Sequence, residues 1–564
     1  MKHLLLTLLI ALLGVGAMVA DPVAAPLITF TVHKPVGTKI SVYLKDSIAG
    51  NQVRIDWGDN TTDTLTAAKA NDFIRMGSSI SISHVMTSDV QTVKIYGNTT
   101  TWFVNFNSLK ASDVSVCDDC PFYEFRCTGD SITDFSFLSK MPRLGYLVTD
   151  NSYQKNLSIK SATLQRLQLG NQPNVETLTL DCPLVYEFTV SKAPVATLDL
   201  SKLPALKKLN LSFLDNLTRL EIKDKPALTS ASCSSSPLLK TVVASNLPLC
   251  TQLSLNSNTS LDDLQLGTLP KLSRLSLSHS GMVNPVFKDI ATLTTLDLDY
   301  SPMVTLTLEN LPALKTLYAG YGKLTTLDLT KVGSEVLSAV HSKNGELRHV
   351  VLAPSHYKTL TALNIQGNHI ALADIPHRPA KVYSKYNDVN YYAPQHMDPV
   401  AESLPVCSKV DLSKYTYGFD IDSNKVASVI SAVTIFGDTL VAGQDYQVTD
   451  GVFTFDKEIG DSVRLIVDNT AFPSFKRTVT TNSKGVTTVT ENRLMTNYFV
   501  VEASALRGDI DGNGIINVSD VTSLVDDLLT PDASKLSICD LNGDGLVNVT
   551  DVTLLVDILL QQSK

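Results

Sequence analysis

Residues 203–228 read "LPALKKLNLSFLDNLTRLEIKDKPAL" and carry one apolar pattern twice. The pattern is LxxLxL, and its two copies start eleven residues apart: Leu206, Leu209, Leu211 and then Leu217, Leu220, Ile222. Side chains two residues apart lie on the same face of a strand, so each LxL pair faces one side. The leucine three residues earlier points inward from the preceding corner. The stretch therefore predicts two short strands that bury leucine on the same side.

The pattern recurs through the middle of the chain, with gaps of ten or eleven residues or small multiples of that. Further copies are Leu261, Leu264, Leu266; Leu272, Leu275, Leu277; Leu293, Leu296, Leu298; and Leu324, Leu327, Leu329. Degenerate copies fill the space between them, from about Val93 to Ile365. A fixed period of this kind indicates a solenoid.

A half-turn of ten or eleven residues is too short for a strand, a helix and two turns. We therefore expect two strands per coil of about 21 or 22 residues, with parallel strands on both broad faces and little helix. Each coil can bury its leucines only against neighbouring coils. Such an array is stable as a stack and needs capped ends.

The copy "LTALNIQGNHI" contains Leu360, Leu363, Ile365, Asn368 and Ile370. In this respect the chain resembles secreted bacterial leucine-rich repeat proteins. Most other copies lack the asparagine that forms a ladder along the turn in that family, although Asn258 is another that has it. The departure favours a straighter body than the usual curved horseshoe.

The end of the chain contains two similar acidic stretches, "GDIDGNGIINVSDVTSLVDDLL" from Gly508 and "CDLNGDGLVNVTDVTLLVDILL" from Cys539. Calcium prefers six to eight oxygen ligands, which one loop can supply at alternate positions. Positions 1, 3, 5, 9 and 12 are Asp509, Asp511, Asn513, Asn517, Asp520 in the first loop and Asp540, Asn542, Asp544, Asn548, Asp551 in the second. The carbonyl oxygens at position 7 belong to Ile515 and Leu546, and the sharp turn at position 6 has Gly514 and Gly545. We expect two Ca²⁺ ions, whose binding is coupled to folding because the carboxylates repel one another without them.

Each loop continues into a predicted helix with an apolar stripe, Val521, Leu524, Val525, Leu528 and Val552, Leu555, Val556, Leu559. No comparable helix precedes either loop, so a complete EF-hand is not expected. The duplicated unit, residues 507–564, resembles a type I dockerin domain. That resemblance implies docking onto a cohesin module through loop positions 10 and 11, which are Val518, Ser519, Val549 and Thr550. Their near-identity implies a quasi-symmetric surface.

The repeats are flanked by other β modules. Residues 26–92 alternate as strands, and Asp56-Trp57-Gly58-Asp59 with His84 resembles a PKD-type β domain. For Asp56 and Asp59 both a metal role and a turn with satisfied carboxylates stay open. We assign 93–372 to the solenoid, 373–408 to a cap and linker, and 409–500 to an Ig-like β-sandwich. The predicted fold class is thus mainly β and multi-domain, with a small α-helical calcium-binding tail.

Near its start the chain has the basic residue Lys2, then an apolar run and small residues, which predicts a signal peptide over 1–20 and export to the cell surface or medium. No later apolar stretch is long enough to span a bilayer. Of the net charge of −9, the tail from Arg507 to Lys564 carries −7, from ten aspartates and three basic residues. The body has no basic patch that would favour nucleic acid. Eight cysteines are sparse for a disulfide scaffold, so buried thiols or one or two disulfides are expected.

The sequence offers no GxSxG or HExxH motif, and its acidic cluster is assigned to calcium. We therefore expect an exported, non-catalytic binding protein whose solenoid presents a surface to a protein or glycan ligand. Its tail would attach it to a cohesin-like partner in a polysaccharide-degrading assembly. The alternative is a carbohydrate-active solenoid, a hydrolase or lyase, or a carbohydrate-binding component of such an assembly.

Overall fold

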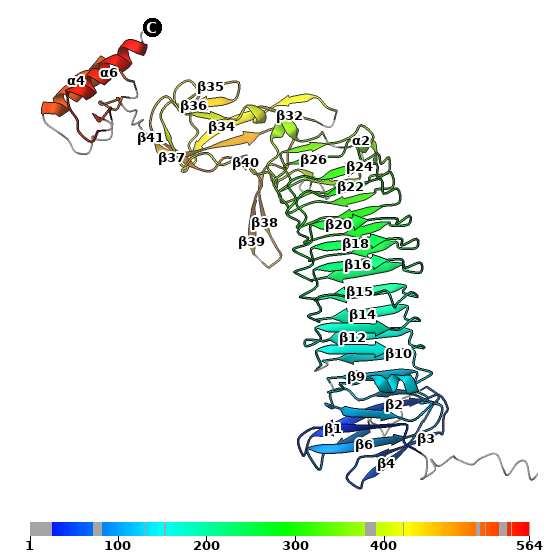
Figure 1. Ribbon diagram of the computed structural model, residues 1–564. Helices are drawn as coiled ribbons and strands as arrows, with labels where there is room; N and C mark the ends of the chain where they lie inside the picture. Colours follow the sequence, from blue (N-terminus) through cyan, green and yellow to red (C-terminus); the bar gives the residue numbers. More distant parts are fainter. Residues whose placement is uncertain are drawn as a thin grey trace, which may run out of the picture. The chain divides into compact units, whose positions relative to one another are not determined.

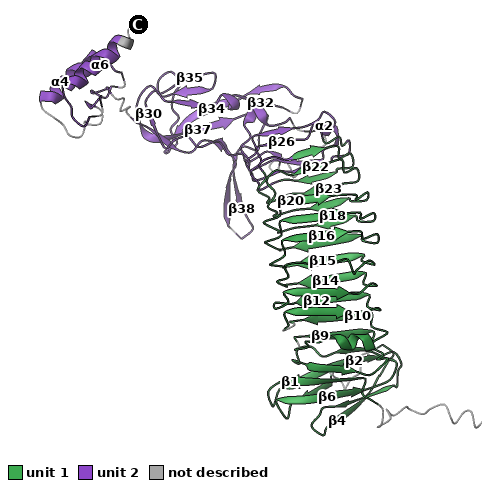
Figure 2. Ribbon diagram, viewed as in Figure 1, with its two compact units in different colours: residues 1–303, 307–319, 332–334 green, residues 304–306, 320–331, 335–564 purple. Residues whose placement is uncertain are grey.

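The computed structural model describes residues 25–71, 82–129, 131–151, 154–377, 379, 391–420, 422–484, 486–502, 508–513, 515–529, 539–542 and 544–562. The predicted signal peptide 1–20, Gly514 and part of the 373–408 cap lie outside these residues. The chain forms two compact units (Figure 2): residues 1–303, 307–319 and 332–334, and residues 304–306, 320–331 and 335–564.

The first unit starts with a five-stranded antiparallel sheet in the order β4-β3-β6-β1-β8. Its strands are β1 (Ile28–His33), β3 (Gln52–Asp56), β4 (Thr62–Thr66), β6 (Val90–Tyr96) and β8 (Ser112–Val116). Alternate side chains such as Ile28, Phe30 and Val32 are completely buried. The expected boundary at residues 92 and 93 falls inside β6, and β8 also pairs with β1, so this module extends to about Val116. Val114 and Val116, which lie within the range where degenerate copies of the repeat were expected, are therefore part of this sheet and not a coil of the solenoid.

The solenoid's first face continues from a second N-terminal sheet, because β2 (Lys39–Asp46) pairs antiparallel with both β5 (Ile82–Val85) and β7 (Thr101–Asn105). From β7 onward the ladder is parallel (Figure 1). In the first unit it runs through β9 (Glu124–Thr128), β10 (Tyr146–Asp150), β12 (Arg166–Asn171), β14 (Glu187–Ser191), β15 (Lys208–Ser212), β17 (Ser230–Ser234), β19 (Gln252–Ser254), β21 (Arg274–Ser276), β23 (Thr295–Asp297) and β25 (Thr316–Tyr318). In the second unit β27 (Ala339–His341) pairs with β29 (Ala362–Asn364).

The second face is built from shorter runs of parallel strands. They are β11 (Asn156–Lys160) with β13 (Thr177–Asp181); β16 (Arg219–Lys223), β18 (Thr241–Ser245) and β20 (Asp263–Leu266); β22 (Val286–Lys288) with β24 (Thr307–Glu309); and, in the second unit, β26 (Thr326–Asp328) with β28 (His349–Val351). Lys208 pairs with Ser230 and Arg219 with Thr241, so one coil advances 22 residues. The prediction of a mainly β solenoid with two strands per coil is confirmed, and the stack has about twelve coils.

The predicted leucines fill the interior of the coils. Leu206, Leu209, Leu217 and Leu220 are all 0% exposed. The corners are equally regular: Phe213, Asp224, Ser235, Asn246 and Ser257 stand eleven residues apart, each with φ between 54° and 59°. A left-handed residue therefore ends each successive half-coil here and turns the chain into the next strand.

Hydroxyl side chains support the corner that precedes the first face. Thr229, Thr251, Ser273 and Thr294 each donate a side-chain hydrogen bond, 2.8–3.2 Å long, to the backbone carbonyl of the previous coil. The high serine and threonine usage of the repeats thus has a structural reason, because each hydroxyl links neighbouring coils.

The second unit also contains a β module with strands β30 (Ser403–Pro405), β31 (Lys409–Asp411), β32 (Tyr417–Phe419), β33 (Lys425–Ala427), β34 (Val429–Thr434), β35 (Gln447–Thr449), β36 (Val452–Thr454), β37 (Ile459–Asp468), β38 (Arg477–Thr481), β39 (Thr487–Glu491), β40 (Leu494–Met495) and β41 (Phe499–Glu502). Its core includes Phe453, Phe455, Leu465 and Phe499. Because β30 pairs with β41, the module starts before the expected residue 409. The chain ends with two helices that pack on each other, α4 (Val518–Leu529) and α6 (Val549–Gln562).

Candidate metal centre

The position-12 aspartate of the first loop, Asp520, organises the backbone around it. Its carboxylate is completely buried in the first turn of α4. Oδ1 accepts the N–H groups of Ile510 (2.8 Å) and Asp511 (3.1 Å), and Oδ2 accepts that of Asn517 (2.7 Å). One side chain therefore joins loop positions 2, 3 and 9 to the start of the helix.

The second loop repeats this network. Asp551 is also 0% exposed, and its Oδ1 accepts the N–H groups of Leu541 (2.8 Å) and Asn542 (3.2 Å). Its Oδ2 accepts the N–H of Asn548 at 2.8 Å. The predicted duplication of sequence is thus a duplication of geometry at equivalent atoms.

Carboxylates converge in the first loop. Asp509, Asp511 and Asp520 each offer an oxygen within 4.8 Å of the others, and within the described ranges no other set of three His, Cys, Asp or Glu side chains is so placed. Asp509 and Asp520 are buried, whereas Asp511 is exposed. The Ser519 hydroxyl donates to Oδ2 of Asp511 at 2.5 Å and, as the main cause, lowers the pKa of that carboxyl. An all-oxygen set of carboxyl groups in one small volume fits a hard divalent cation such as calcium.

The predicted ligands of the second loop accept hydrogen bonds from backbone N–H groups of their own loop. Oδ2 of Asp540 accepts the N–H of Gly545, and Oδ1 of Asp544 accepts that of Leu546, both at 2.8 Å. Gly545 has φ of +83°, the left-handed conformation that the glycine at position 6 was expected to supply. Aspartates at positions 1, 5 and 12 and Asn542 at position 3 give this loop an oxygen-only donor set as well.

The asparagines at position 9 cap the N-termini of the helices in this structure. The side-chain oxygen of Asn517 accepts the N–H of Ser519 (2.7 Å), and that of Asn548 accepts the N–H of Thr550 (2.8 Å), as N-cap residues do. Their amide nitrogens donate to the carbonyl oxygens of Ile515 (3.2 Å) and Leu546 (3.5 Å). The predicted ligands at positions 7 and 9 therefore contact each other, an arrangement that ligand spacing alone did not reveal.

The helices hold the two loops together around one small core. Ile510, Leu524, Cys539 and Leu555 are buried in it. Of the residues expected to meet a partner, Val518 and Val549 start α4 and α6 and are 74% and 73% exposed. The hydroxyls of Ser519 and Thr550 instead point back into their own loops, to Asp511 and Asn548.

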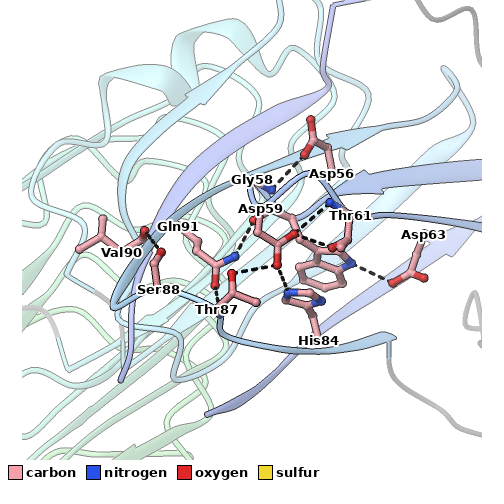
Figure 3. Close-up of polar contacts among 11 residues, drawn as sticks. Asp56, Gly58, Asp59, Thr61, Asp63, His84, Thr87, Ser88, Val90 and Gln91 are labelled. Carbon is pink, nitrogen blue, oxygen red and sulfur yellow. Dashed lines mark hydrogen bonds and ion pairs between the residues drawn. The ribbon is translucent and has the colours of Figure 1, made fainter. Parts of the chain in front are cut away.

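The aspartates of the N-terminal module form a satisfied turn (Figure 3). Oδ1 of Asp59 accepts the N–H and hydroxyl of Thr61, while Oδ2 contacts Nε2 of His84 (2.8 Å) and the hydroxyl of Thr87 (3.0 Å). The ring of Trp57 stacks on His84 with centroids 4.8 Å apart. Asp56 caps the same turn by accepting the N–H of Gly58 at 3.0 Å. Of the two alternatives left open by the sequence, these contacts favour the turn with satisfied carboxylates.

Comparison with protein families identifies the tail. Residues 507–560 match the family described as "Dockerin type I domain". This segment is therefore a dockerin type I domain, following a leucine-rich-repeat-like β-solenoid. Dockerin type I domains bind calcium and dock onto cohesins, and they occur on extracellular cellulosomal proteins. No curated protein matches the chain.

Among solved structures, the chain is similar to YopM from Yersinia enterocolitica WA-314 at 19% identity and a TM-score of 0.31, covering 50% of this chain and 55% of that one. It is also similar to the functional domain of InlJ from Listeria monocytogenes at 15% identity and a TM-score of 0.30, covering 71% and 90%. It is similar as well to the leucine-rich repeat domain of APL1B, at 13% identity and a TM-score of 0.29, covering 59% of this chain and 86% of that one. No helix within the described ranges has the length and apolar character needed to cross a membrane.

Proposed function

We propose that this chain is an exported, non-catalytic binding protein that is tethered through its tail. Two calcium ions, one per loop, order the tail, which then docks onto a cohesin-type module at the cell surface or in a polysaccharide-degrading assembly. The solenoid presents the ligand-binding surface. The observation that carries the proposal is the repeated network in which Asp520 and Asp551 each accept three loop N–H groups at equivalent positions.

Two ions are supported by the composition of the two loops. Each has carboxylate or amide oxygens at positions 1, 3, 5, 9 and 12, and a carbonyl at position 7. The Asn517–Ile515 and Asn548–Leu546 contacts place the side-chain amide of position 9 next to the carbonyl oxygen of position 7. When an ion binds, the oxygens of both positions would turn from their present partners to the ion.

The proposed docking surface has the same exposed side chains in both copies. Val518 in the first copy corresponds to Val549 in the second. Likewise Ile515 corresponds to Leu546, and these two side chains are 64% and 67% exposed. With Ser519 and Thr550 these residues give two near-equivalent patches. Such a surface suits a partner that engages either copy.

We also propose an identity for each of the two β modules that flank the solenoid. The Trp57, Asp59 and His84 contacts support a PKD-like N-terminal cap. The sheets of the second unit's β module support an Ig-like role as a spacer between solenoid and tail.

Calorimetric titration of the full chain with CaCl₂ tests the metal part. Two binding events are expected, and Asp520→Asn and Asp551→Asn are each expected to lose one, because an amide supplies one oxygen and no charge. Each change also replaces one of the two acceptor oxygens by an NH₂ group, so at least one N–H of the network loses its acceptor, which costs about 1–3 kcal/mol of tail stability. Asp557→Asn is the matched control, since Asp557 is an exposed carboxylate on α6.

Docking is tested by capture of the full chain on an immobilised type I cohesin, with and without EDTA. We expect calcium-dependent capture that Asp557→Asn retains and the double variant Asp520→Asn/Asp551→Asn loses. Capture that ignores both EDTA and the double variant would contradict the proposal.

The competing function, a carbohydrate-binding solenoid, has one structural observation in its favour. A hollow of about 660 Å³ is lined by Trp102, Tyr123, Arg143 and Gln165 among others. The Tyr123 ring lies over Gly145, and a Cβ added to Gly145 would come within 2.3 Å of that ring. Tyr123 is 41% exposed. Aromatic rings next to polar groups suit sugar rings. Retardation of the chain in gels containing soluble xylan or pectin would favour this reading.

A further inference from the structure

The second face of the solenoid is interrupted between β20 and β22. Successive strands β16, β18 and β20 are hydrogen-bonded neighbours, and so are β22 and β24. No pairing joins β20 to β22 among the described residues, although every residue of this stretch is described. The first face has no such break at the same coils, because β19 pairs with β21 and β21 with β23.

Pro285 removes one backbone hydrogen bond at the interruption. On this face the residue before each strand donates its N–H to the previous coil: Lys240 to the carbonyl of Thr218 at 2.9 Å, and Asp262 to that of Lys240 at 3.2 Å. The next equivalent residue is Pro285, which has no N–H to donate. The coil from Asp262 to Pro285 is also 23 residues long, one more than the coil before it. The ladder then resumes, because Thr307 donates to the carbonyl of Pro285.

The break opens the leucine core. Leu264 and Leu266 on β20 pair in register with Val242 and Ala244 on β18. Val242 and Ala244 are 0% exposed, whereas Leu264 and Leu266 are only partly buried. The sequence predicted that these two leucines face inward as part of an LxxLxL copy, but it did not predict that they would be less buried than the residues paired with them on β18.

A cavity lies at this position. It has a volume of about 760 Å³, and its walls come from β20 with the loop after it and from β22 with its flanking loops. Its lining includes Leu264, Leu266, Met282, Pro285 and Phe287. The rest of the lining includes polar and charged side chains, so the walls are mixed in character. A cavity of several hundred Å³ that combines apolar and polar groups is the usual setting for a bound ligand.

The rim of the cavity is acidic. Asp262, Asp263 and Asp289 line it. The one lining cation, Lys288, is paired with Glu309 at 3.1 Å. The charge that an incoming ligand meets is therefore negative.

The geometry points to this cavity, which we call the slot, as the binding site of an extended peptide from a partner protein. The peptide would have apolar side chains at alternate positions and basic residues at both of its ends. The edge of β20 presents a strand's own spacing of N–H and C=O groups, which another strand can satisfy along its length. The side chains that alternate toward Leu264 and Leu266 would refill the opened core. The basic ends would meet Asp262, Asp263 and Asp289. This inference deepens the proposed binding role of the solenoid and is independent of calcium-dependent docking by the tail.

Fluorescence anisotropy with the full chain tests it, using the labelled peptide Lys-Val-Thr-Val-Thr-Val-Lys. The comparison peptide Lys-Val-Pro-Val-Pro-Val-Lys keeps the charge and the valines but cannot donate backbone hydrogen bonds at the proline positions. We expect it to bind about tenfold more weakly or worse, because two backbone hydrogen bonds are lost. Binding is expected to be equal in calcium and in EDTA, which separates this test from that of the tail.

Two variants on β20 locate the site. Leu264→Lys places a cation in the slot and is expected to abolish binding of the threonine peptide. Gln265→Lys adds the same charge to the adjacent, outward-facing residue of the same strand and is expected to leave binding within about twofold. Thermal unfolding of both variants shows whether the coil is intact. Equal binding of the two peptides by the native chain would overturn the inference. So would a slot that takes up the apolar dye anilinonaphthalene sulfonate but binds neither of the two peptides.

Discussion

Buried aspartates in this chain are surrounded by neutral hydrogen-bond donors. Asp46 is 0% exposed and accepts hydrogen bonds from the hydroxyls of Thr100 and Thr101, the amide of Asn51 and the N–H of Ile48. Asp520 and Asp551 accept backbone N–H groups in the same way. A buried carboxylate is costly unless such donors replace its water. The donors also fix the oxygens in place, and in the tail these oxygens belong to the proposed calcium ligands.

Asp59 makes the stability of the N-terminal module depend on pH. Burial opposes its ionisation, but the hydrogen bonds from Thr61, Thr87 and His84 together hold the pKa of Asp59 far below its ordinary value. A carboxyl whose folded pKa is depressed adds stability above its unfolded pKa of about 4, and this stability is lost as the pH falls below that value. Because Trp57 and Trp102 are the chain's two tryptophans and both lie in this region, their fluorescence during thermal unfolding reports on it.

Asp59→Asn provides the comparison. Between pH 5 and pH 2.5 the unfolding midpoint of the native chain is expected to fall more than that of Asp59→Asn, which has no carboxyl to titrate. Asp118→Asn should behave as the native chain does, because the side chain of Asp118 is 88% exposed. Parallel curves for the native chain and Asp59→Asn would show that the Asp59 carboxylate contributes nothing to the module's stability.

At the level of the repeat element, buried amides and hydroxyls replace the missing asparagine ladder. Asn258 is 0% exposed; it accepts the N–H of Ser236 (2.9 Å) and donates to the carbonyls of Cys233 (2.9 Å) and Leu255 (2.8 Å). In other coils serine does part of this work, as where the Ser236 hydroxyl accepts the N–H of Leu214 at 3.1 Å. The repeat therefore tolerates degenerate copies, because a smaller polar side chain can still accept the N–H of the previous coil.

Asn258→Ala is expected to destabilise the solenoid by about 2–4 kcal/mol, since it leaves one N–H and two carbonyl groups buried without partners. Asn258→Ser is expected to cost less, because serine at Ser236 accepts the equivalent N–H. Asn216→Ala, at an exposed asparagine with one hydrogen bond to the carbonyl of Pro194, should change the stability by less than about 0.5 kcal/mol. Urea unfolding followed by circular dichroism measures all three. Equal losses in Asn258→Ala and Asn258→Ser would exclude this role for the hydroxyl.

The sequence predicted the solenoid correctly because its period is a local property. Leu209 and Leu211 must share a face whatever the rest of the chain does, and eleven-residue spacing leaves room for one strand and one corner. The gap at Leu264 and Leu266 depends instead on Pro285, a residue one coil away whose position in the ladder is known only from the structure. The corner at Phe213 was equally hidden, since aromatic residues rarely take a left-handed conformation.

In the whole molecule, too, local features could be predicted from the sequence, whereas features that depend on distant residues could not. The order of modules, from β cap through solenoid and second β module to calcium-type loops, could be predicted because each has its own composition. Boundaries could not, because strands beyond the expected limits complete existing sheets: β8 joins β1, and β30 joins β41. In the first loop of the tail, ligand spacing brought together Asp509, Asp511 and Asp520, which offer oxygens close to one another in the structure. It did not reveal that Asp520 and Asp551 also hold the backbone of their loops.

Removal of calcium is expected to loosen the tail and leave the solenoid unchanged, because the two parts are stabilised by different forces. The tail's core is small, with Ile510, Leu524, Cys539 and Leu555, and its loops concentrate carboxylates that repel one another without a cation. The coils depend on buried leucine and on hydrogen bonds between neighbours, neither of which involves a metal. Hydrogen exchange of the full chain in CaCl₂ and in EDTA should therefore show faster exchange in 508–529 and 539–562 and equal protection in 203–228. Asp557→Asn should repeat the native result, whereas Asp520→Asn/Asp551→Asn should exchange rapidly in both buffers. A tail that stays protected in EDTA would show that its fold does not need the ions, and loss of protection in 203–228 would show that the solenoid depends on them.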